Sequence, residues 1–203
     1  MFHMFRPAAT GTAVALALTL SLSACQGDTE TASETPASPS ASQTPTASPS
    51  PTDVATAAKD DNVKNAEKRH REFLNIRNAH AKKGEDPFAD LLNDGYLGNA
   101  EMRESEQSFW GQYVDLGLKQ VGESHIESVE ATEYEGDPRE RDITGHRVHL
   151  KVCMDNSDYD VVRPDGSSAI AKGSSRLVMN VVMQGQPAGL WSVAKTQSTG
   201  NEC

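Results

Sequence analysis

Histidine side chains are the residues with which this chain could most readily hold a metal ion or move a proton. His70 and His80 are ten residues apart in a helical pattern, which places them on similar faces but about 15 Å apart along the axis. They are therefore too far apart to share one ion. His146 and His149 are three residues apart in a strand pattern, so we expect them on opposite faces. The histidine spacing predicts no metal site.

Other motifs with defined chemistry are missing as well. One turn is acidic and contains Asp155, Asp158 and Asp160. It lacks the sixth-position glycine and the distal glutamate of an EF-hand calcium loop. The sequence contains no G-x-S-x-G, P-loop or G-x-G-x-x-G pattern, so it predicts no cofactor and no catalytic residue. The net charge of −10 argues against a nucleic-acid partner, which requires clustered Lys and Arg.

The N-terminal residues have the pattern of an export signal. Residues 8–22 form an apolar run that is too short for a comfortable membrane-spanning helix, and small residues and a cysteine follow it. The run ends in Leu22-Ser23-Ala24-Cys25, which resembles the lipobox of bacterial lipoprotein precursors. An ordinary secretory signal and a single-span anchor are the alternatives.

The resemblance implies that residues 1–24 are removed and that the thiol of Cys25 carries a diacylglycerol group. Two or three acyl chains give stable anchoring, whereas one chain is marginal. We therefore expect Cys25 to attach the protein to the outer face of the cytoplasmic membrane, from which it extends into the cell wall.

The remaining cysteines, Cys153 and Cys203, then form an even pair. In an oxidising extracytoplasmic compartment such a pair predicts a structural disulfide. A redox role is disfavoured because there is no C-x-x-C spacing and no histidine beside either thiol.

Composition divides the rest of the chain into a tether and one domain. Residues 25–58 are rich in Ser, Thr, Pro and Ala, and cannot bury enough apolar surface to order themselves. A plain spacer and an O-glycosylated stalk are both compatible with this composition. Residues 59–203 have the length and patterning of one domain.

Hydrophobic periodicity within the domain changes once along the chain. Helical patterns are expected over residues 59–83, 87–92 and 99–116. From residue 124 onward the period is two, with strands at 124–134, 148–153, 177–183 and 190–196. The strand at 177–183 is apolar on both faces and should be central. Asp165-Gly166 indicates a hairpin turn. Helices followed by an antiparallel sheet predict an α+β fold.

The order of these segments resembles small secreted or lipid-anchored actinobacterial proteins with an NTF2-like, cystatin-related cone. The resemblance rests on residues 148–155, the Asp165-Gly166 turn and the segment Gly189-Leu190-Trp191-Ser192-Val193, and covers about residues 62–197. It implies N-terminal helices packed on a curved antiparallel sheet. It implies no particular activity, because one fold hosts enzymes, binders and assembly modules.

Some NTF2-like cones resemble ketosteroid isomerases and cyclases, which use a pocket aspartate as base. The candidates for such chemistry are Asp115 with Tyr113, and Asp94 with Tyr96. Neither pair lies in a recognisable motif, and Tyr113 is favoured as a core residue. Of the two tryptophans, we expect Trp191 in the core and Trp110 at a rim or partner surface, since Trp110 is turned about 100° from Phe109 and Tyr113 on a helix.

Taken together, these features predict a lipid-anchored binding or interaction protein of the bacterial cell envelope rather than an enzyme. Its expected partners are the membrane, through Cys25, and either an envelope protein or a small apolar ligand. The alternatives are an enzyme of the ketosteroid-isomerase or cyclase type and a pure cell-surface spacer. A binding protein should have a sizeable apolar pocket or an exposed apolar patch.

Overall fold

The computed structural model describes residues 51–170 and 175–203. The predicted signal peptide and Cys25 lie outside the described residues, as does the predicted tether up to residue 50. The elements follow one another as α1 (Pro51–Lys83), α2 (Phe88–Asn93), α3 (Ala100–Asp115), β1 (Lys119–Val121), β2 (His125–Glu135), β3 (Arg147–Asp155), β4 (Asp160–Val162), β5 (Arg176–Gly185), the short 3-10 helix η1 (Pro187–Gly189) and β6 (Trp191–Ser198). The fold is therefore α+β, with helices first and an antiparallel sheet after them, as predicted.

Helix α1 is longer than the sequence pattern predicted. It begins at Pro51 rather than at Lys59, so residues 51–58, which were assigned to the tether, are helical. Proline is tolerated in the first helical turn because its missing N–H would have no partner there. Basic residues occupy the last turn, where they complement the helix dipole.

Side chains accept hydrogen bonds from amides at the starts of α2 and α3, at the N-cap residue itself only in α3. The Asp86 carboxylate accepts a hydrogen bond from the Phe88 amide at 2.7 Å, and the Asn99 side chain accepts one from the Met102 amide at 2.8 Å. Each cap satisfies an amide that has no partner within the helix. Both helices therefore start within a residue or two of the predicted positions.

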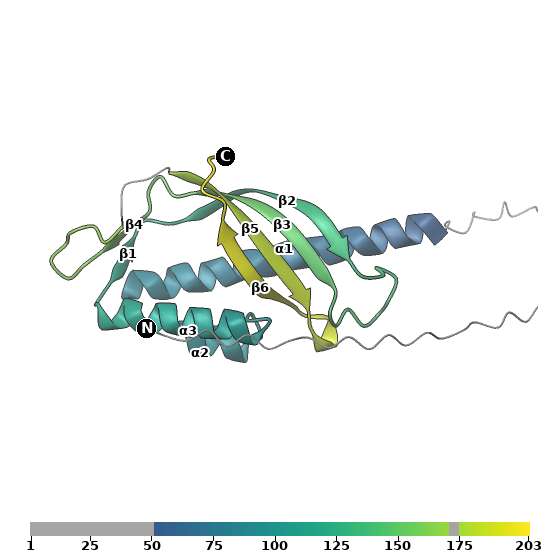
Figure 1. The fold of residues 1–203 in the computed structure, drawn as a ribbon, viewed down its shortest axis with the longest axis horizontal. Coiled ribbons are helices and arrows are strands. Elements are labelled where there is room, and N and C mark those ends of the chain that lie inside the picture. The colour runs from purple at the N-terminus through teal and green to yellow at the C-terminus, as the bar shows by residue number, and fades with distance from the viewer. Residues whose placement is uncertain (1–50, 171–174) are drawn as a thin grey trace, which may run out of the picture. The chain divides into compact units, whose positions relative to one another are not determined.

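Four strands form the main sheet, in the order β2-β3-β5-β6, and all neighbours are antiparallel. Strand β5 is central, as its two apolar faces predicted. Register shifts interrupt the β2–β3 ladder twice and the β5–β6 ladder once. Bulges of this kind bend a strand and increase its twist, and the strands in Figure 1 curve as they cross α1.

The segment between β3 and β5 leaves this sheet. Strand β4 pairs with β1, a short strand that the sequence analysis missed, to form a separate two-stranded sheet. The predicted hairpin at Asp165-Gly166 is present as a turn, in which the Gly166 amide donates to the Arg163 carbonyl at 2.9 Å. Its second arm is only a single bridge between Val162 and Ser168.

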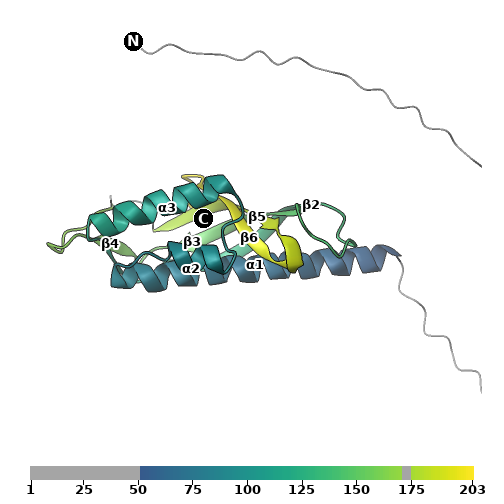
Figure 2. The ribbon, with the colours of Figure 1, turned by 90° about the horizontal axis from the view of Figure 1, so that it is seen from below.

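Two hydrophobic clusters fill the domain. The larger lies between α1 and the main sheet and includes Phe73, Leu150, Val181, Met183 and Trp191. The smaller lies where α1 ends, against α3 and β4, and contains Ala81, Trp110, Tyr113 and Val161. In Figures 1 and 2, α1 and α3 run in similar directions, and in Figure 2 the strands are seen between them. Within the described residues, no helix is long and apolar enough to span a membrane.

Candidate ligand pocket

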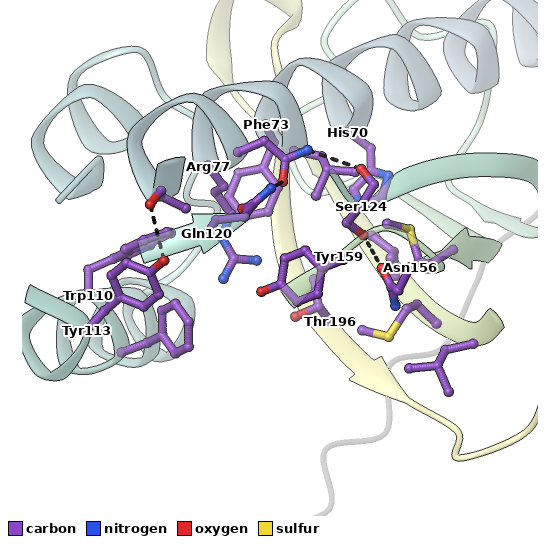
Figure 3. A pocket seen from close by; sticks show the side chains of 18 residues that line it. His70, Phe73, Arg77, Trp110, Tyr113, Gln120, Ser124, Asn156, Tyr159 and Thr196 are labelled. Carbon is purple, nitrogen blue, oxygen red and sulfur yellow. Dashed lines mark hydrogen bonds between the residues drawn. The ribbon is translucent and has the colours of Figure 1, made fainter. Parts of the chain in front are cut away.

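A cavity of about 220 Å³ lies where the two hydrophobic clusters meet. Its lining comes from α1, α3 and both sheets. Side chains from the larger cluster, such as Phe73, Met179 and Val181, form one wall, and side chains from the smaller cluster, such as Trp110 and Tyr113, form another. The cavity exists because neither core closes the gap between them (Figure 3).

The wall formed by the main sheet is apolar. It consists of Met154 on β3, Leu177, Met179 and Val181 on β5, and the methyl-bearing Thr196 on β6. Alternate residues of a strand point to the same face, so 177, 179 and 181 line the cavity together. This wall offers an apolar ligand a continuous surface of aliphatic and thioether groups.

The opposite wall carries a cation, Arg77 of α1. Its guanidinium carbon lies 5.3–5.4 Å from the ring centres of Phe73, Phe109 and Trp110. These distances are within the range of cation–π attraction, which holds the charge among the aromatic rings. Figure 3 shows the guanidinium group pointing into the space between Trp110, Tyr113 and Tyr159.

Glu106 of α3 offsets part of this charge. Its Oε2 atom lies 3.3 Å from Arg77 Nε and accepts a hydrogen bond from Trp110 Nε1 at 2.8 Å. Glu106 is 5% exposed, and a carboxylate that is buried so deeply needs such partners to offset the loss of hydration. Arg77, Glu106 and Trp110 therefore form one polar unit inside the smaller cluster.

Two tyrosines of the pocket differ in how their hydroxyls are used. Tyr113 Oη donates to the Ala81 carbonyl at 3.2 Å, and burial raises the pKa of Tyr113 to about 12. Burial also raises the pKa of Tyr159, which Arg77 partly counteracts. Among the described residues, none gives the Tyr159 hydroxyl a hydrogen bond. Tyr159 is thus a neutral donor whose proton is free for a ligand.

His70 closes the pocket on the side of α1. It is 5% exposed, its ring stacks on Phe73, and its buried Nδ1 atom has no hydrogen-bond partner in the described part of the chain. Burial, together with the nearby charges of Arg71 and Arg77, lowers the pKa of His70 to about 4. His70 is therefore neutral near pH 7.

Polar side chains at the third wall form hydrogen bonds with one another and with nearby carbonyl groups. The Gln120 amide donates to Asn78 Oδ1 at 3.1 Å and to the Gly122 carbonyl at 3.0 Å. Asn78 in turn donates to the Ser124 carbonyl at 3.1 Å, and Ser124 binds Asn156 through its hydroxyl. This chain ties α1 to β1 and β2, and it seals this part of the wall rather than offering free groups to a ligand.

The acid–tyrosine pairs proposed for catalysis do not meet in the pocket. Asp115 and Asp94 are both exposed, and neither lines the cavity. Tyr96 lies elsewhere, under the guanidinium of Arg69 at 3.5 Å and 3.4 Å from Glu72 Oε2. Tyr113 does line the pocket, as a buried residue of the smaller cluster, in the core position predicted for it.

The positions of the two tryptophans agree with prediction in one case only. Trp191 is buried at 2% exposure, as expected. Trp110 was expected at a rim, but it is also 2% exposed, whereas its neighbour Phe109 is 45% exposed. The prediction failed because α3 turns the side of Glu106 and Trp110, and not that of Phe109, toward α1.

The predicted cysteine pair is brought together by the sheet and the C-terminal segment. The Sγ atoms of Cys153 and Cys203 are 2.01 Å apart, the distance of a disulfide bond. Cys25 lies outside the described residues, so its lipid attachment stays a prediction.

The described histidines outside the pocket each lie close to an acid. His80 Nε2 lies 3.1 Å from Asp90. His149 Nε2 lies 2.7 Å from Glu135, and Glu133 is close enough that the three could offer ligand atoms within 4.8 Å of one another. This cluster was not predicted. Its Glu135 is already paired with His149 and Arg147 on the exposed side of the sheet.

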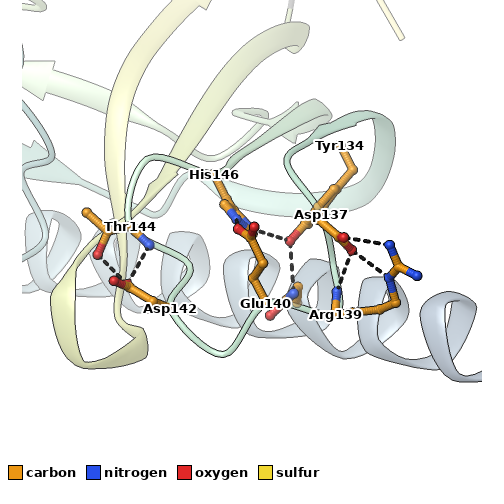
Figure 4. A network of polar contacts seen from close by, with 8 residues as sticks. Tyr134, Asp137, Arg139, Glu140, Asp142, Thr144 and His146 are labelled. Atoms are coloured by element: carbon orange, nitrogen blue, oxygen red, sulfur yellow. Dashed lines mark hydrogen bonds and ion pairs between the residues drawn. The ribbon is translucent and has the colours of Figure 1, made fainter. Parts of the chain in front are cut away.

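A polar network also organises the loop between β2 and β3 (Figure 4). The buried His146 ring lies 2.8 Å from Tyr134 Oη and 3.1 Å from Glu140 Oε2, through its two nitrogens. The Asp137 carboxylate binds Arg139, whose hydrogen bonds hold the pKa of Asp137 at about 2. The spacing predicted that His146 and His149 share a strand. His146 instead precedes β3, which begins at Arg147.

Comparison with known proteins assigns this chain to no family. No protein-family model matches the sequence, and no curated protein matches it. Among solved structures, the chain is similar to the intermembrane space region of the chloroplast protein ARC6, with a TM-score of 0.37 and 11% sequence identity. The match covers 63% of this chain and 94% of that one. A likeness at this level carries no argument about function.

Proposed function

We propose that this chain is a lipid-anchored binding protein of the bacterial cell envelope whose domain takes a small, mainly apolar molecule. The cavity between the two hydrophobic clusters is the observation that carries the proposal. At about 220 Å³ it is smaller than the roughly 300–1,000 Å³ pockets that enclose drug-sized molecules. The ligand is accordingly smaller than these.

Several features of the described residues support binding over the alternatives. The cavity is lined mostly by apolar and aromatic side chains, with a smaller number of polar groups, which is the usual composition of a small-molecule site. Glu106, the buried carboxylate of the described residues, is already engaged by Arg77 and Trp110. An isomerase-type mechanism would need a carboxylate free to take a proton from a ligand. A pure spacer would need no cavity.

The fold and the location are part of the same proposal. An NTF2-like cone would place helices against a curved sheet and leave a chamber between them, and the bulged strands and the cavity are compatible with that arrangement. The lipobox at residues 22–25 supports export and acylation of Cys25. Helix α1 would then join the domain to the Ser/Thr/Pro-rich segment.

Ligand binding is tested by titrating the soluble domain with octanol while recording tryptophan fluorescence, because Trp110 lines the cavity. Met179→Trp places a large ring in the cavity and should abolish the response. The matched control is Asn180→Trp, one residue further along β5 on the exposed face, which should leave the response intact. Equal responses in both variants would contradict the proposed pocket.

The anchor is tested separately in a bacterium that processes lipoproteins. The wild-type chain should fractionate with membranes and incorporate a fatty-acid analogue, and Cys25→Ser should lose both properties. Unchanged membrane association of the variant would rule out the lipid anchor without bearing on the pocket.

A further inference from the structure

Arg77 is the feature of the pocket that an apolar ligand alone leaves unexplained. Its side chain is 26% exposed, and only its Nε atom faces Glu106, at 3.3 Å. In the described part of the chain, no oxygen accepts a hydrogen bond from either terminal nitrogen of the guanidinium. A guanidinium offers five N–H donors in a planar fork, so most of its donors are left for another partner.

The groups around the Arg77 guanidinium restrict its movement. Three aromatic rings flank the guanidinium, and the Glu106 carboxylate, itself fixed by Trp110, binds it from the other side. Such an arrangement costs more than a solvent-exposed arginine would, because it removes part of the hydration of a charge. It also fixes the fork in advance, which lowers the entropy lost when a ligand binds.

A second donor lies near the same point. Arg77 is close enough to Tyr159 to influence its hydroxyl, and that hydroxyl has no hydrogen-bond partner among the residues described. In Figure 3 the Tyr159 hydroxyl and the Thr196 hydroxyl both point toward the region of the guanidinium. The polar groups of α1, the β3–β4 connection and β6 therefore converge at one end of the cavity.

We propose that the ligand of this pocket is a small amphipathic carboxylate. Its carboxylate is bound by the guanidinium fork of Arg77 with a further hydrogen bond from Tyr159, and its apolar body lies against Met154, Leu177 and Met179 of the sheet. This inference rests on the proposed function, since it names the class of ligand for the same pocket.

The charge balance favours a carboxylate over a phosphate. Arginine forks bind both groups in a bidentate manner. Arg77 is the one cation among the described lining residues, because His70 is neutral, and Glu106 lies 3.3 Å from it, so a ligand with two negative charges meets more repulsion here than a ligand with one. A phosphate monoester carries close to two negative charges at pH 7 and would be repelled by Glu106.

The test compares ligands of equal chain length at pH 7. Octanoate should bind the wild-type domain roughly tenfold or more tightly than octanol, because charge-assisted hydrogen bonds add to the same apolar contact. Octyl phosphate should bind more weakly than octanoate. Equal affinities for octanoate and octanol would overturn the inference while leaving the proposed function in place, and tighter binding of octyl phosphate would overturn the choice of carboxylate. Failure of all three to bind would overturn the proposed function itself.

Variants separate ligand recognition from a structural role of Arg77. Arg77→Met alone would leave Glu106 buried without its partner, so we pair it with Glu106→Gln to preserve folding. The double variant should lose the preference for octanoate, so that octanoate binds no more tightly than octanol. Tyr159→Phe, which removes only the hydroxyl, should weaken octanoate about three- to tenfold and weaken octanol by less. A preference for octanoate that survives in the double variant would contradict the proposal.

Discussion

His70 shows how one buried residue connects the pocket to the stability of the domain. It lies on α1 between the two clusters, with its ring against Phe73 and with Arg71 and Arg77 nearby. Burial is the main cause that lowers its pKa from 6.5 to about 4. In the folded domain, therefore, His70 takes up a proton only in strongly acidic solution.

This shift predicts a loss of stability in acid. Between pH 6.5 and about 4 the unfolded chain binds a proton at His70 that the folded chain does not, so the free energy of unfolding falls as the pH is lowered through this window. The full contribution, present above pH 6.5, is roughly 3 kcal/mol. Urea unfolding at pH 7 and pH 4.5 should show less of this loss in His70→Leu than in the wild type.

His125 provides the control for this measurement. Its side chain is 60% exposed on β2, so His125→Gln should keep the wild-type dependence on pH. If His70→Leu and the wild type lose equal stability between pH 7 and pH 4.5, the buried neutral state of His70 is contradicted.

At the scale of the elements, two glycines differ in whether the structure has room for a side chain. Gly111 lies inside α3, and an added Cβ would meet nothing within 4 Å. Gly185 ends β5, and an added Cβ there would lie 2.0 Å from the Ile143 carbonyl oxygen. The close approach at Gly185 holds the β2–β3 connection against the end of the sheet, through hydrogen bonds to Gly145 and His146.

The same substitution should therefore have opposite effects at the two positions. Gly111→Ala should raise the free energy of unfolding by about 0.5–1 kcal/mol, because alanine loses less backbone entropy in a helix. Gly185→Ala should lower it by about 1–3 kcal/mol or more, because the backbone must move to relieve the overlap. Chemical denaturation of the two variants beside the wild type checks both. A tolerated Gly185→Ala would contradict the described packing of Ile143.

At the scale of the whole domain, the C-terminal segment is held to the sheet at more than one point. The Cys153–Cys203 pair joins β3 to the last residue across 50 positions. The Val178 amide of β5 also donates to the Asn201 carbonyl at 3.0 Å, and the Thr199 amide donates to the Val178 carbonyl. These contacts continue the pairing of the C-terminal segment with β5 past the end of β6.

Loss of the disulfide should destabilise the domain without changing its fold. A bridge closing a loop of this length contributes about 3–5 kcal/mol in the loop-entropy account. Cys153→Ser/Cys203→Ser should accordingly lower the melting temperature, and alkylation of the unfolded wild-type chain without reductant should find neither thiol free. Two modifiable thiols, or an unchanged melting temperature, would contradict this role.

The sequence alone determined the kind of each main element and which cysteines pair within the domain. Periodicity of 3.6 and of 2 reports local burial, so it located α1, α3 and the strands β2, β3, β5 and β6 to within a few residues, apart from the early start of α1. An apolar run on both faces placed β5 in the centre of the sheet. Such patterns need no knowledge of distant partners.

Only the tertiary structure decided which face of α3 is buried, and with it the pocket. The apolar stripe in the sequence suggested Phe109 with Tyr113, but the buried stripe is Met102, Glu106, Trp110 and Tyr113. Glu106 interrupts the apolar pattern of this stripe, so hydrophobicity alone does not identify it. The Glu106 carboxylate can be buried because Arg77 of α1, 29 positions earlier, lies 3.3 Å away. Pairing between elements distant in the chain offsets the cost of burying charge, and no local signal encodes it. The pocket arises from the same long-range packing, because its walls come from residues between 70 and 196 that meet only in the folded chain.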